Sequence, residues 1–112
     1  MAYRVLFGSK AARQFRKFTP ALQQRIRELL TDVAKDPYAK SLILSSDLAH
    51  LRYIKFSHQG TPYRIVFKVS EEHQEIGVIF LGTRQNFYRD LKRYLRSSHD
   101  DDERLAASVA AR

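Results

Sequence analysis

The sequence of 112 residues contains no cysteine and no tryptophan, and only three prolines and four glycines. Without cysteine the chain has neither a disulfide framework nor a thiolate metal site, which fits a reducing cytoplasm. It has no apolar run near the roughly 20 residues that a membrane span needs, and its first fifteen residues lack the apolar core of a signal peptide. These absences predict one cytoplasmic domain that folds around its own hydrophobic residues, without membrane association.

Signatures of several enzyme classes are also missing. The sequence contains no Ser-His-Asp order, HExxH motif, P-loop or CxxC pair. The acidic residues are scattered over expected turns and helix exteriors. The histidines fall in expected turns or in the tail, and no two share a helix face or strand at ligand spacing; they are His50, His58, His73 and His99. The sequence therefore favours neither a metal site, nor a cofactor, nor a paired-carboxylate hydrolase.

Acidic side chains are few beside the basic ones. The chain has 20 Lys and Arg against 12 Asp and Glu, a net charge of +8. Residues 99–112 hold four acids and two arginines, so residues 1–98 carry 18 basic side chains against 8 acidic ones. A positive field on so small a domain favours polyanions. Nucleic acid or the ribosome, an acidic protein partner, and a surface that is merely basic and solvated are all compatible with it.

Helical periodicity occurs in three segments. Residues 10–18 follow Ser9, a plausible N-cap, and residues 20–36 follow Thr19 as N-cap with Pro20 at the first helical position. A third helix is expected over residues 86–96. The three apolar stripes, at spacings of three and four residues, are Ala11, Phe15 and Phe18; Leu22, Ile26, Leu29, Leu30 and Val33; and Phe87, Leu91, Tyr94 and Leu95. The first two helices are joined tightly and form a helical hairpin that must lie on a sheet.

Strand signals are alternating or β-branched runs that end at turn residues. They lie at residues 2–7, 51–57, 63–69 and 75–81, with the last run apolar enough for a central strand. The segment from residue 38 to 49 reads as an irregular connector with room for one helical turn. The order β-α-α-β-β-β-α predicts an α+β fold: a small, twisted antiparallel sheet with the helical hairpin and the other helix on one face.

The last part of the chain changes character. We expect one domain over residues 1–96, followed by a tail over residues 97–112 that is first acidic and then alanine-rich. Acidic residues suit the start of a helix, so the tail is either a short helix or a disordered extension.

A phenol and three cations fall on or beyond the ends of the expected strands: Lys55, Arg64, Arg84 and Tyr88. Such a group suits a phosphodiester substrate. RNA cleavage needs no metal, because the 2′-OH of the substrate can attack. Arginines can bind phosphate oxygens in bidentate fashion, and a tyrosine can act as a base if cations lower its pKa. Further RNA contacts are expected from Arg52, Tyr53, His58, Lys68 and Arg89.

Each of these residues also has an ordinary structural interpretation. An arginine that begins a strand is commonly solvated, and a tyrosine on an apolar helix face is commonly a core residue. Tyr53 and Tyr63 are as compatible with packing as with base stacking. A turn histidine is commonly solvated.

Three segments in order resemble a known group of toxins. MAYRVLFGSKAARQFRKF is similar to a first strand and helix, TPYRIVFKV to a strand that opens with Tyr-Arg, and IGVIFLGTRQNFYRDLKRYL to a last strand, a Gly-x-Arg turn and a helix with a tyrosine. Together they resemble the RelE/ParE superfamily of type II toxin–antitoxin toxins over about residues 1–96. The nearest branch is the RelE-like, ribosome-dependent mRNA interferases.

The resemblance implies a RelE-like microbial RNase fold and a role for each candidate residue. Lys55 would stabilise charge or donate a proton, Arg64 and Arg84 would contact phosphate, and Tyr88 would be the general base. Tyr53 stands where the branch has a further lysine. Implied partners are mRNA in the A site of the 30S ribosomal subunit, a cognate antitoxin, and operator DNA through the antitoxin complex only. The alternatives are a ParE-like inhibitor of DNA gyrase that acts by binding, and a non-catalytic RNA-binding member.

Overall fold

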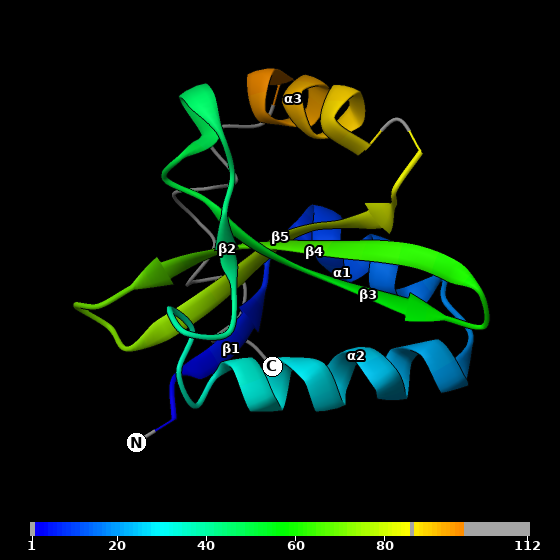
Figure 1. Cartoon of the computed structure of the whole chain (residues 1–112), viewed down its shortest axis with the longest axis horizontal. Helices are drawn as coiled ribbons and strands as arrows, with labels where there is room; N and C mark the ends of the chain where they lie inside the picture. The colour runs from blue at the N-terminus through cyan, green and yellow to red at the C-terminus, as the bar shows by residue number, and fades with distance from the viewer. Residues whose placement is uncertain (1, 86, 98–112) are drawn as a thin grey trace.

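The computed structural model describes residues 2–85 and 87–97, and the expected tail lies outside them apart from its first residue. The described chain is an α+β fold, as predicted (Figure 1). Its elements are β1 (Arg4–Phe7), α1 (Ser9–Arg16), α2 (Pro20–Val33), β2 (Leu42–Ile43), a 3-10 turn η1 (Ser46–Leu48), β3 (Arg52–His58), β4 (Thr61–Ser70), β5 (Glu75–Thr83) and α3 (Phe87–Ser97).

The sheet has five strands in the order β1-β5-β4-β3-β2. Its centre is the predicted antiparallel meander of β3, β4 and β5. The purely antiparallel sheet is wrong, because β1 pairs in parallel with β5, from Arg4 opposite Glu75 to Phe7 opposite Val78. Alternating hydrophobicity marks a strand but not its direction or neighbour. The short strand β2 lies in the segment that was expected to be an irregular connector. The sequence did not predict it because two residues are too few to show alternation.

The turn between β3 and β4 has only two residues. Gln59 and Gly60 both have positive φ, at 53° and 82°, which is typical of a type I′ turn whose twist matches the flanking strands. The strands therefore extend further than the sequence predicts. His58 pairs with Thr61 inside the ladder, so its expected position in the hairpin loop is wrong.

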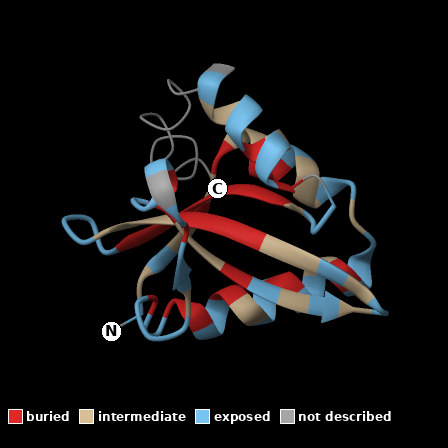
Figure 2. Cartoon of the chain, turned by 45° about the horizontal axis from the view of Figure 1, so that its top comes forward, coloured by how far each residue is buried: buried red, intermediate tan, exposed pale blue. Residues whose placement is uncertain are grey.

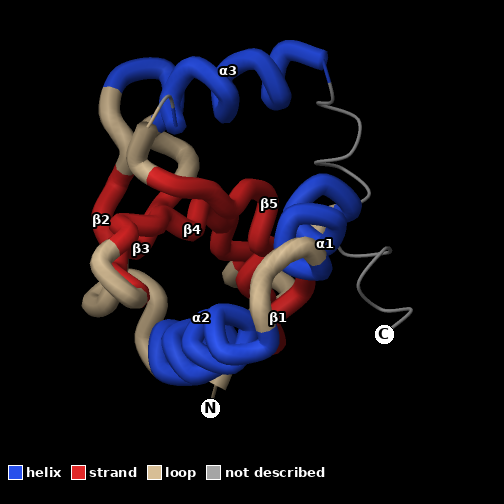
Figure 3. Tube along the Cα trace, turned by 90° about the vertical axis from the view of Figure 1, so that its right-hand side faces the viewer, coloured by secondary structure: helices blue, strands red, loops and turns tan. Residues whose placement is uncertain are grey.

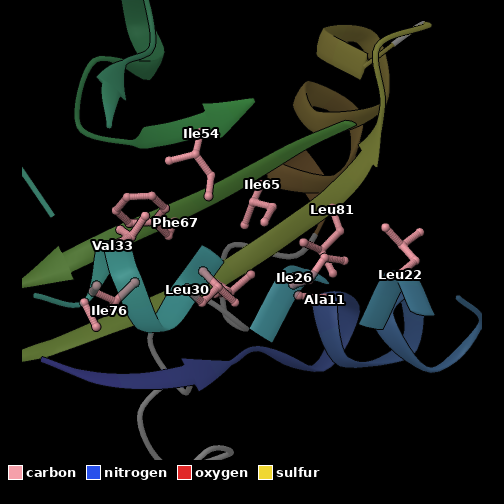
Figure 4. Packing of buried hydrophobic residues seen from close by; sticks show 12 residues of the cluster. Ala11, Leu22, Ile26, Leu30, Val33, Ile54, Ile65, Phe67, Ile76 and Leu81 are labelled. Carbon is pink, nitrogen blue, oxygen red and sulfur yellow. The ribbon is translucent and has the colours of Figure 1, made fainter. Parts of the chain in front are cut away.

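The helical hairpin covers one face of the sheet, as predicted. Thr19 is the N-cap of α2, and its Oγ1 accepts a hydrogen bond from the N–H of Leu22 at 3.2 Å. Ser9 is not the cap of α1: the helix already includes it, and Gly8 is the N-cap residue without a side-chain bond. The apolar stripes of α1 and α2 pack against the sheet (Figure 4) in a buried cluster of Ala11, Leu22, Ile26, Leu30, Val33, Ala34, Ile54, Ile65, Phe67, Ile76, Val78 and Leu81.

The third helix lies on the opposite face, which corrects the expectation that all helices share one face (Figure 3). Neighbouring side chains of a strand point to opposite faces, so the apolar strands β4 and β5 offer a surface on both sides. A bulge adds to this, because Val66 pairs with Phe80 and Phe67 with Val78, which leaves Ile79 as an extra residue. The second cluster contains Leu44, Leu48, Leu51, Val66, Ile79, Phe80, Phe87 and Leu91.

Helix α1 also closes the edge of the sheet beyond the end of β1. The ladder between β1 and β5 ends where the N–H of Gly8 donates to the carbonyl of Val78 at 2.8 Å. Further along β5, the N–H of Leu81 donates to the side-chain Oε1 of Gln14 at 2.8 Å. A side chain thus satisfies a backbone donor that a further strand would otherwise reach.

Candidate active site

The centre of the candidate site is a row of residues across three strands. Lys55 of β3 lies directly opposite Arg64 of β4, and Arg64 lies directly opposite Gly82 of β5. Residues directly opposite one another project to the same face of a sheet. Val66, two positions after Arg64, belongs to the cluster under α3, so this row faces the side of α3. Figure 2 shows that the buried middle of the sheet gives way to intermediate and exposed residues towards the β3–β4 hairpin.

The guanidinium of Arg64 is surrounded by aromatic rings. Its Cζ lies 5.4 Å from the ring centroid of Tyr88, 5.8 Å from that of Phe87 and 5.9 Å from that of Tyr53. All three are within cation–π range. A guanidinium held through its faces keeps its in-plane N–H groups available for a phosphate. The rings therefore hold in place a guanidinium that has the chemistry to bind a phosphate.

Tyr88 reaches this site because the residue before it is anchored. Phe87 is buried, and its ring would lie 3.4 Å from a Cβ built on Gly82. Tyr88, by contrast, is 39% exposed, and its ring meets that of Phe87 edge-on at 5.8 Å. The sequence places Phe87 on an apolar helix face but does not reveal that it positions the tyrosine. The sequence signal that could have revealed this role is the glycine at position 82, which leaves room for the ring of Phe87.

Arg84 is at the same end of the sheet but in different surroundings. Its backbone N–H donates to the carbonyl of Pro62 at 3.2 Å, which continues the β4–β5 pairing past Thr83. Its side chain lines a hollow with Thr61, Pro62, Thr83 and Gln85. Lys55, Arg64 and Tyr88 do not line that hollow. The structure thus brings Arg64 and Tyr88 into contact and aligns Lys55 with them, while Arg84 occupies a neighbouring position.

Arg52 is separated from this group. Its Nε donates to Ser41 Oγ at 2.6 Å, and its Nη2 donates to the carbonyl of Tyr38 at 3.1 Å. Its guanidinium also lies 5.2 Å from the ring centroid of Tyr38. Arg52 and Lys55 are three residues apart on one strand, so their side chains leave opposite faces. Arg52 holds the connector before β2, and this position gives no support to its expected contact with RNA.

The remaining expected RNA contacts have mixed positions. His58 follows Ile54 by an even number of positions on β3, so it projects to the same face of the sheet, the one that α2 covers. Its buried Nε2 has no hydrogen-bond partner among the described residues. Lys68 lies on the face of Arg64, further along β4 and opposite Gly77. Arg89 follows Tyr88 on α3, where its Nε lies 3.4 Å from Asp90 Oδ1 in an exposed pair. Only Tyr53, Lys68 and Arg89 are therefore on the side of α3.

Perturbed pKa values occur at another place, around the β4–β5 turn. The hydroxyl of Tyr3 donates to Glu71 Oε1 at 2.5 Å. Hydrogen bonds from Tyr3 and Tyr38 lower the pKa of Glu71. In turn, the bond to Glu71 raises the pKa of Tyr3, and that of Tyr38 to about 12. This exposed cluster links the N-terminal segment, the connector and the β4–β5 turn. The sequence did not predict it.

The side chains of the site that could take part in a reaction are cations and a phenol. Within residues 2–85 and 87–97, no three His, Asp or Glu side chains gather in a way that could hold a metal ion. In the same part of the chain, no helix is both long and apolar enough to cross a membrane. Two cations in a row beside an exposed phenol can bind a phosphate and stabilise charge on it.

Comparison with known proteins gives a consistent result. The sequence profile described as "ParE-like toxin of type II bacterial toxin-antitoxin system" matches residues 5–92. No curated protein matches the sequence.

Solved structures share the fold. A double arginine-to-alanine mutant of E. coli toxin RelE in the free state is 26% identical, with a TM-score of 0.65, covering 83% of this chain and 98% of that one. The toxin–antitoxin complex RelBE2 of Mycobacterium tuberculosis is 24% identical, with a TM-score of 0.63 and coverages of 75% and 93%. The RelE–RelB complex of Pyrococcus horikoshii is 20% identical, with a TM-score of 0.54 and coverages of 76% and 98%.

The profile spans most of the described chain, from the second residue of β1 into α3. The solved toxins share the sheet with its flanking helices. The resemblance to the RelE/ParE superfamily is thereby confirmed. This chain belongs to the ParE-like toxin family of type II bacterial toxin–antitoxin systems, and its fold is that of the RelE toxins.

Proposed function

We propose that this toxin is a ribosome-dependent endoribonuclease that cuts mRNA in the ribosomal A site, without a metal ion. One observation carries the proposal: Arg64 stands directly opposite Lys55 and in contact with the ring of Tyr88. These residues come from two strands and a helix, and a binding surface alone would not require a phenol held against a caged arginine. The site of action would be the cytoplasm, where ribosomes translate.

The proposed reaction is attack of a ribose 2′-oxygen on the adjacent phosphorus. The bond from phosphorus to the 5′-oxygen breaks, which leaves a 2′,3′-cyclic phosphate and a free 5′-hydroxyl. Tyr88 would accept the 2′-OH proton, and a cation of the site would deliver a proton to the leaving oxygen. Arg64 and Lys55 would stabilise the negative charge that grows on the phosphorane, a kind of stabilisation that is usually the largest catalytic contribution.

A cognate antitoxin is the expected partner. The similar M. tuberculosis protein was solved as a toxin–antitoxin complex, and that of P. horikoshii as a RelE–RelB complex. The excess of basic side chains over residues 1–98 suits a partner with an acidic surface. Contact with operator DNA would arise only through that complex.

The proposal is tested by inducible expression followed by primer extension on abundant mRNAs. The wild-type chain should produce cuts in phase with codons. Arg64→Ala, Arg84→Ala and Tyr88→Phe should remove or strongly weaken them, while the exposed Arg27→Ala on α2 should not. Cuts that persist at the wild-type rate in Tyr88→Phe would disprove its role as base. Intact mRNA during growth arrest would disprove the nuclease itself.

One observation favours a second function, inhibition of DNA gyrase by binding: the matching family is described as ParE-like. A supercoiling assay with purified gyrase separates the two. Blocked supercoiling with intact mRNA would identify the gyrase inhibitor. RNA binding that produces neither cuts nor blocked supercoiling would identify a non-catalytic member.

A further inference from the structure

A hollow next to the candidate site has the size of a ligand site. It measures about 530 Å³ and is lined by Thr61, Pro62, Thr83, Arg84 and Gln85. Small-molecule sites commonly measure roughly 300–1,000 Å³. Three other hollows of the described surface have volumes of about 220, 240 and 280 Å³, below that range.

Backbone hydrogen bonds connect Arg84, one of the residues that line the hollow, to β4 and to α3. The N–H of Arg84 donates to the carbonyl of Pro62 at 3.2 Å, and the carbonyl of Arg84 accepts from the N–H of Phe87 at 3.3 Å. Arg84 and Gln85 are thus fixed between the β4–β5 ladder and the buried first residue of α3. Thr61 and Thr83 stand at the ends of the neighbouring strands β4 and β5, where their side chains leave the face opposite to that of Pro62 and Arg64, so the hollow lies around the end of the sheet. Backbone hydrogen bonds therefore tie the lining residues to the sheet and to the start of α3.

The hollow also lies at a useful distance from Arg64. Pro62 and Arg64 are two positions apart on β4, so they project to the same face and are roughly 7 Å apart. That is about the span of one nucleotide of an extended RNA strand. A chain whose scissile phosphate is held at Arg64 would thus place the neighbouring nucleotide in the hollow.

The lining chemistry matches a nucleotide. Arg84 supplies a cation for a phosphate, and the hydroxyls of Thr61 and Thr83 can donate or accept a hydrogen bond. The amide of Gln85 carries both donors and an acceptor, the combination that distinguishes one base edge from another. Pro62 adds an apolar surface against which a base can lie.

We propose that this hollow is a subsite for the nucleotide beside the cleaved bond, with Arg84 on its phosphate and Gln85 reading its base. The inference rests on the proposed RNA-cleaving function and adds a division of labour to it. Lys55, Arg64 and Tyr88 act on the bond that breaks, whereas Gln85 selects which sequence is cut. Arg84 links the two regions.

Binding is measured first, because it does not depend on cleavage. The isotope-labelled full-length protein is titrated with adenosine, cytidine, guanosine and uridine 5′-monophosphates and followed by backbone amide NMR. We expect shifts at Thr61, Thr83, Arg84 and Gln85, with affinities that differ about five-fold or more between bases. Gln85→Ala should equalise the four affinities. The matched control, Gln24→Ala on the exposed side of α2, should not.

Other binding results would overturn the subsite. Absent shifts, or shifts confined to Lys55 and Arg64, would show that no nucleotide enters the hollow. Equal affinities for the four monophosphates in the wild type would show a phosphate contact without base reading.

Cleavage preference is the second measurement. Programmed ribosomes carry mRNAs that differ only in the nucleotide beside the cut. Gln85→Ala should lower the preference among the four by about five-fold or more, and Gln85→Glu should change which base is preferred. An unchanged preference in both variants would overturn the inference even if the protein cuts RNA. Base-selective binding without any cutting would retain the subsite and reject the nuclease.

Discussion

The two faces of the sheet are built from the same strands but are covered very differently. On one face, α1 and α2 bury a continuous apolar cluster that extends from Leu22 to Val33 along α2 (Figure 4). On the other face, α3 covers a smaller cluster, and Lys55 and Arg64 lie beside it. The alternation of side chains along each strand allows one face to be closed for stability and the other to remain half open for chemistry.

The arginines show the same contrast. Arg27 lies 5.2 Å from the ring of Phe15 on the side of the helical hairpin. Arg64 lies near three rings on the other side. A cation over one partly buried ring is a common surface arrangement, whereas a cation held by three rings beside a lysine is confined to one place. The open face therefore has a defined arrangement of side chains of its own.

The largest effect is expected from opening the closed face. Phe67→Ala should lower the free energy of unfolding by about 3–5 kcal/mol, because it removes a fully buried ring. A domain of this size has only about 5–15 kcal/mol in all. Urea denaturation followed by circular dichroism measures the change. Lys55→Ala, an exposed position on the open face, is the control and should change stability by less than about 0.5 kcal/mol. Equal losses in the two variants would contradict the contrast between the faces.

The second effect should appear in activity and not in folding. Arg64→Ala should lower the cleavage rate by about 10²–10³-fold, as expected for the loss of a group that stabilises the transition state. Single-turnover cleavage on programmed ribosomes measures it. Arg27→Ala also removes a cation–π contact but should cleave at the wild-type rate. Two variants with similar rates would show that Arg64 has no special role.

A third change tests how α3 is seated on the open face. Gly82→Val adds bulk where a Cβ alone would already lie 3.4 Å from the Phe87 ring. We expect a loss of about 1–3 kcal/mol from overpacking and a fall in cleavage, because Phe87 positions Tyr88. Denaturation and cleavage are measured on the same samples. Gly82→Ala, which makes only ordinary contact, should have a much smaller effect on both; full activity in the valine variant would show that Tyr88 is positioned otherwise.

The smallest effect concerns the cluster at the β4–β5 turn, away from Arg64. Hydrogen bonds from Tyr3 and Tyr38 hold the pKa of Glu71 below its ordinary value of 4.5. The associated stability is therefore present above the ordinary pKa and is lost as the pH falls through the lowered one. The difference in melting temperature between wild type and Glu71→Gln should be largest near neutral pH and vanish in acid. Glu72→Gln, one residue further on, is the control; a difference that stays constant with pH would contradict the linkage.

The same cluster predicts a change in strong alkali. The pKa of Tyr38 is raised to about 12 from an ordinary value of 10.0. Its contribution is present below pH 10 and is lost as the pH rises towards 12, because the unfolded chain ionises first. Tyrosinate absorbance should show a group that titrates near pH 12 and disappears in Tyr38→Phe.

Much of the fold could be predicted because local signals were strong. Thr19 and Pro20 mark the start of α2, and the apolar run of β5 marks a central strand, and both predictions are confirmed. The parallel pairing of β1, the position of α3 on the second face and the short strand β2 could not be predicted. Each depends on contacts between segments far apart in the sequence, and periodicity describes only one segment at a time.

The candidate site divides in the same way. The sequence pointed to Lys55, Arg64, Arg84 and Tyr88 as residue types suited to a phosphodiester. Their roles remain a proposal, although Lys55, Arg64 and Tyr88 share one side of the sheet. The sequence could not show that Arg52 binds the connector, because a guanidinium can donate hydrogen bonds to a carbonyl or a hydroxyl as well as to a phosphate.

The sequence alone determined the helices, the meander and the basic charge of this toxin, since propensity, periodicity and charge are properties of short segments. Only the tertiary structure decided which face of each strand would be covered. The register of β3, β4 and β5 aligns Lys55 with Arg64 and Gly82, and the missing side chain of Gly82 admits Phe87. Packing across the sheet, which no single segment encodes, brings Tyr88 to Arg64.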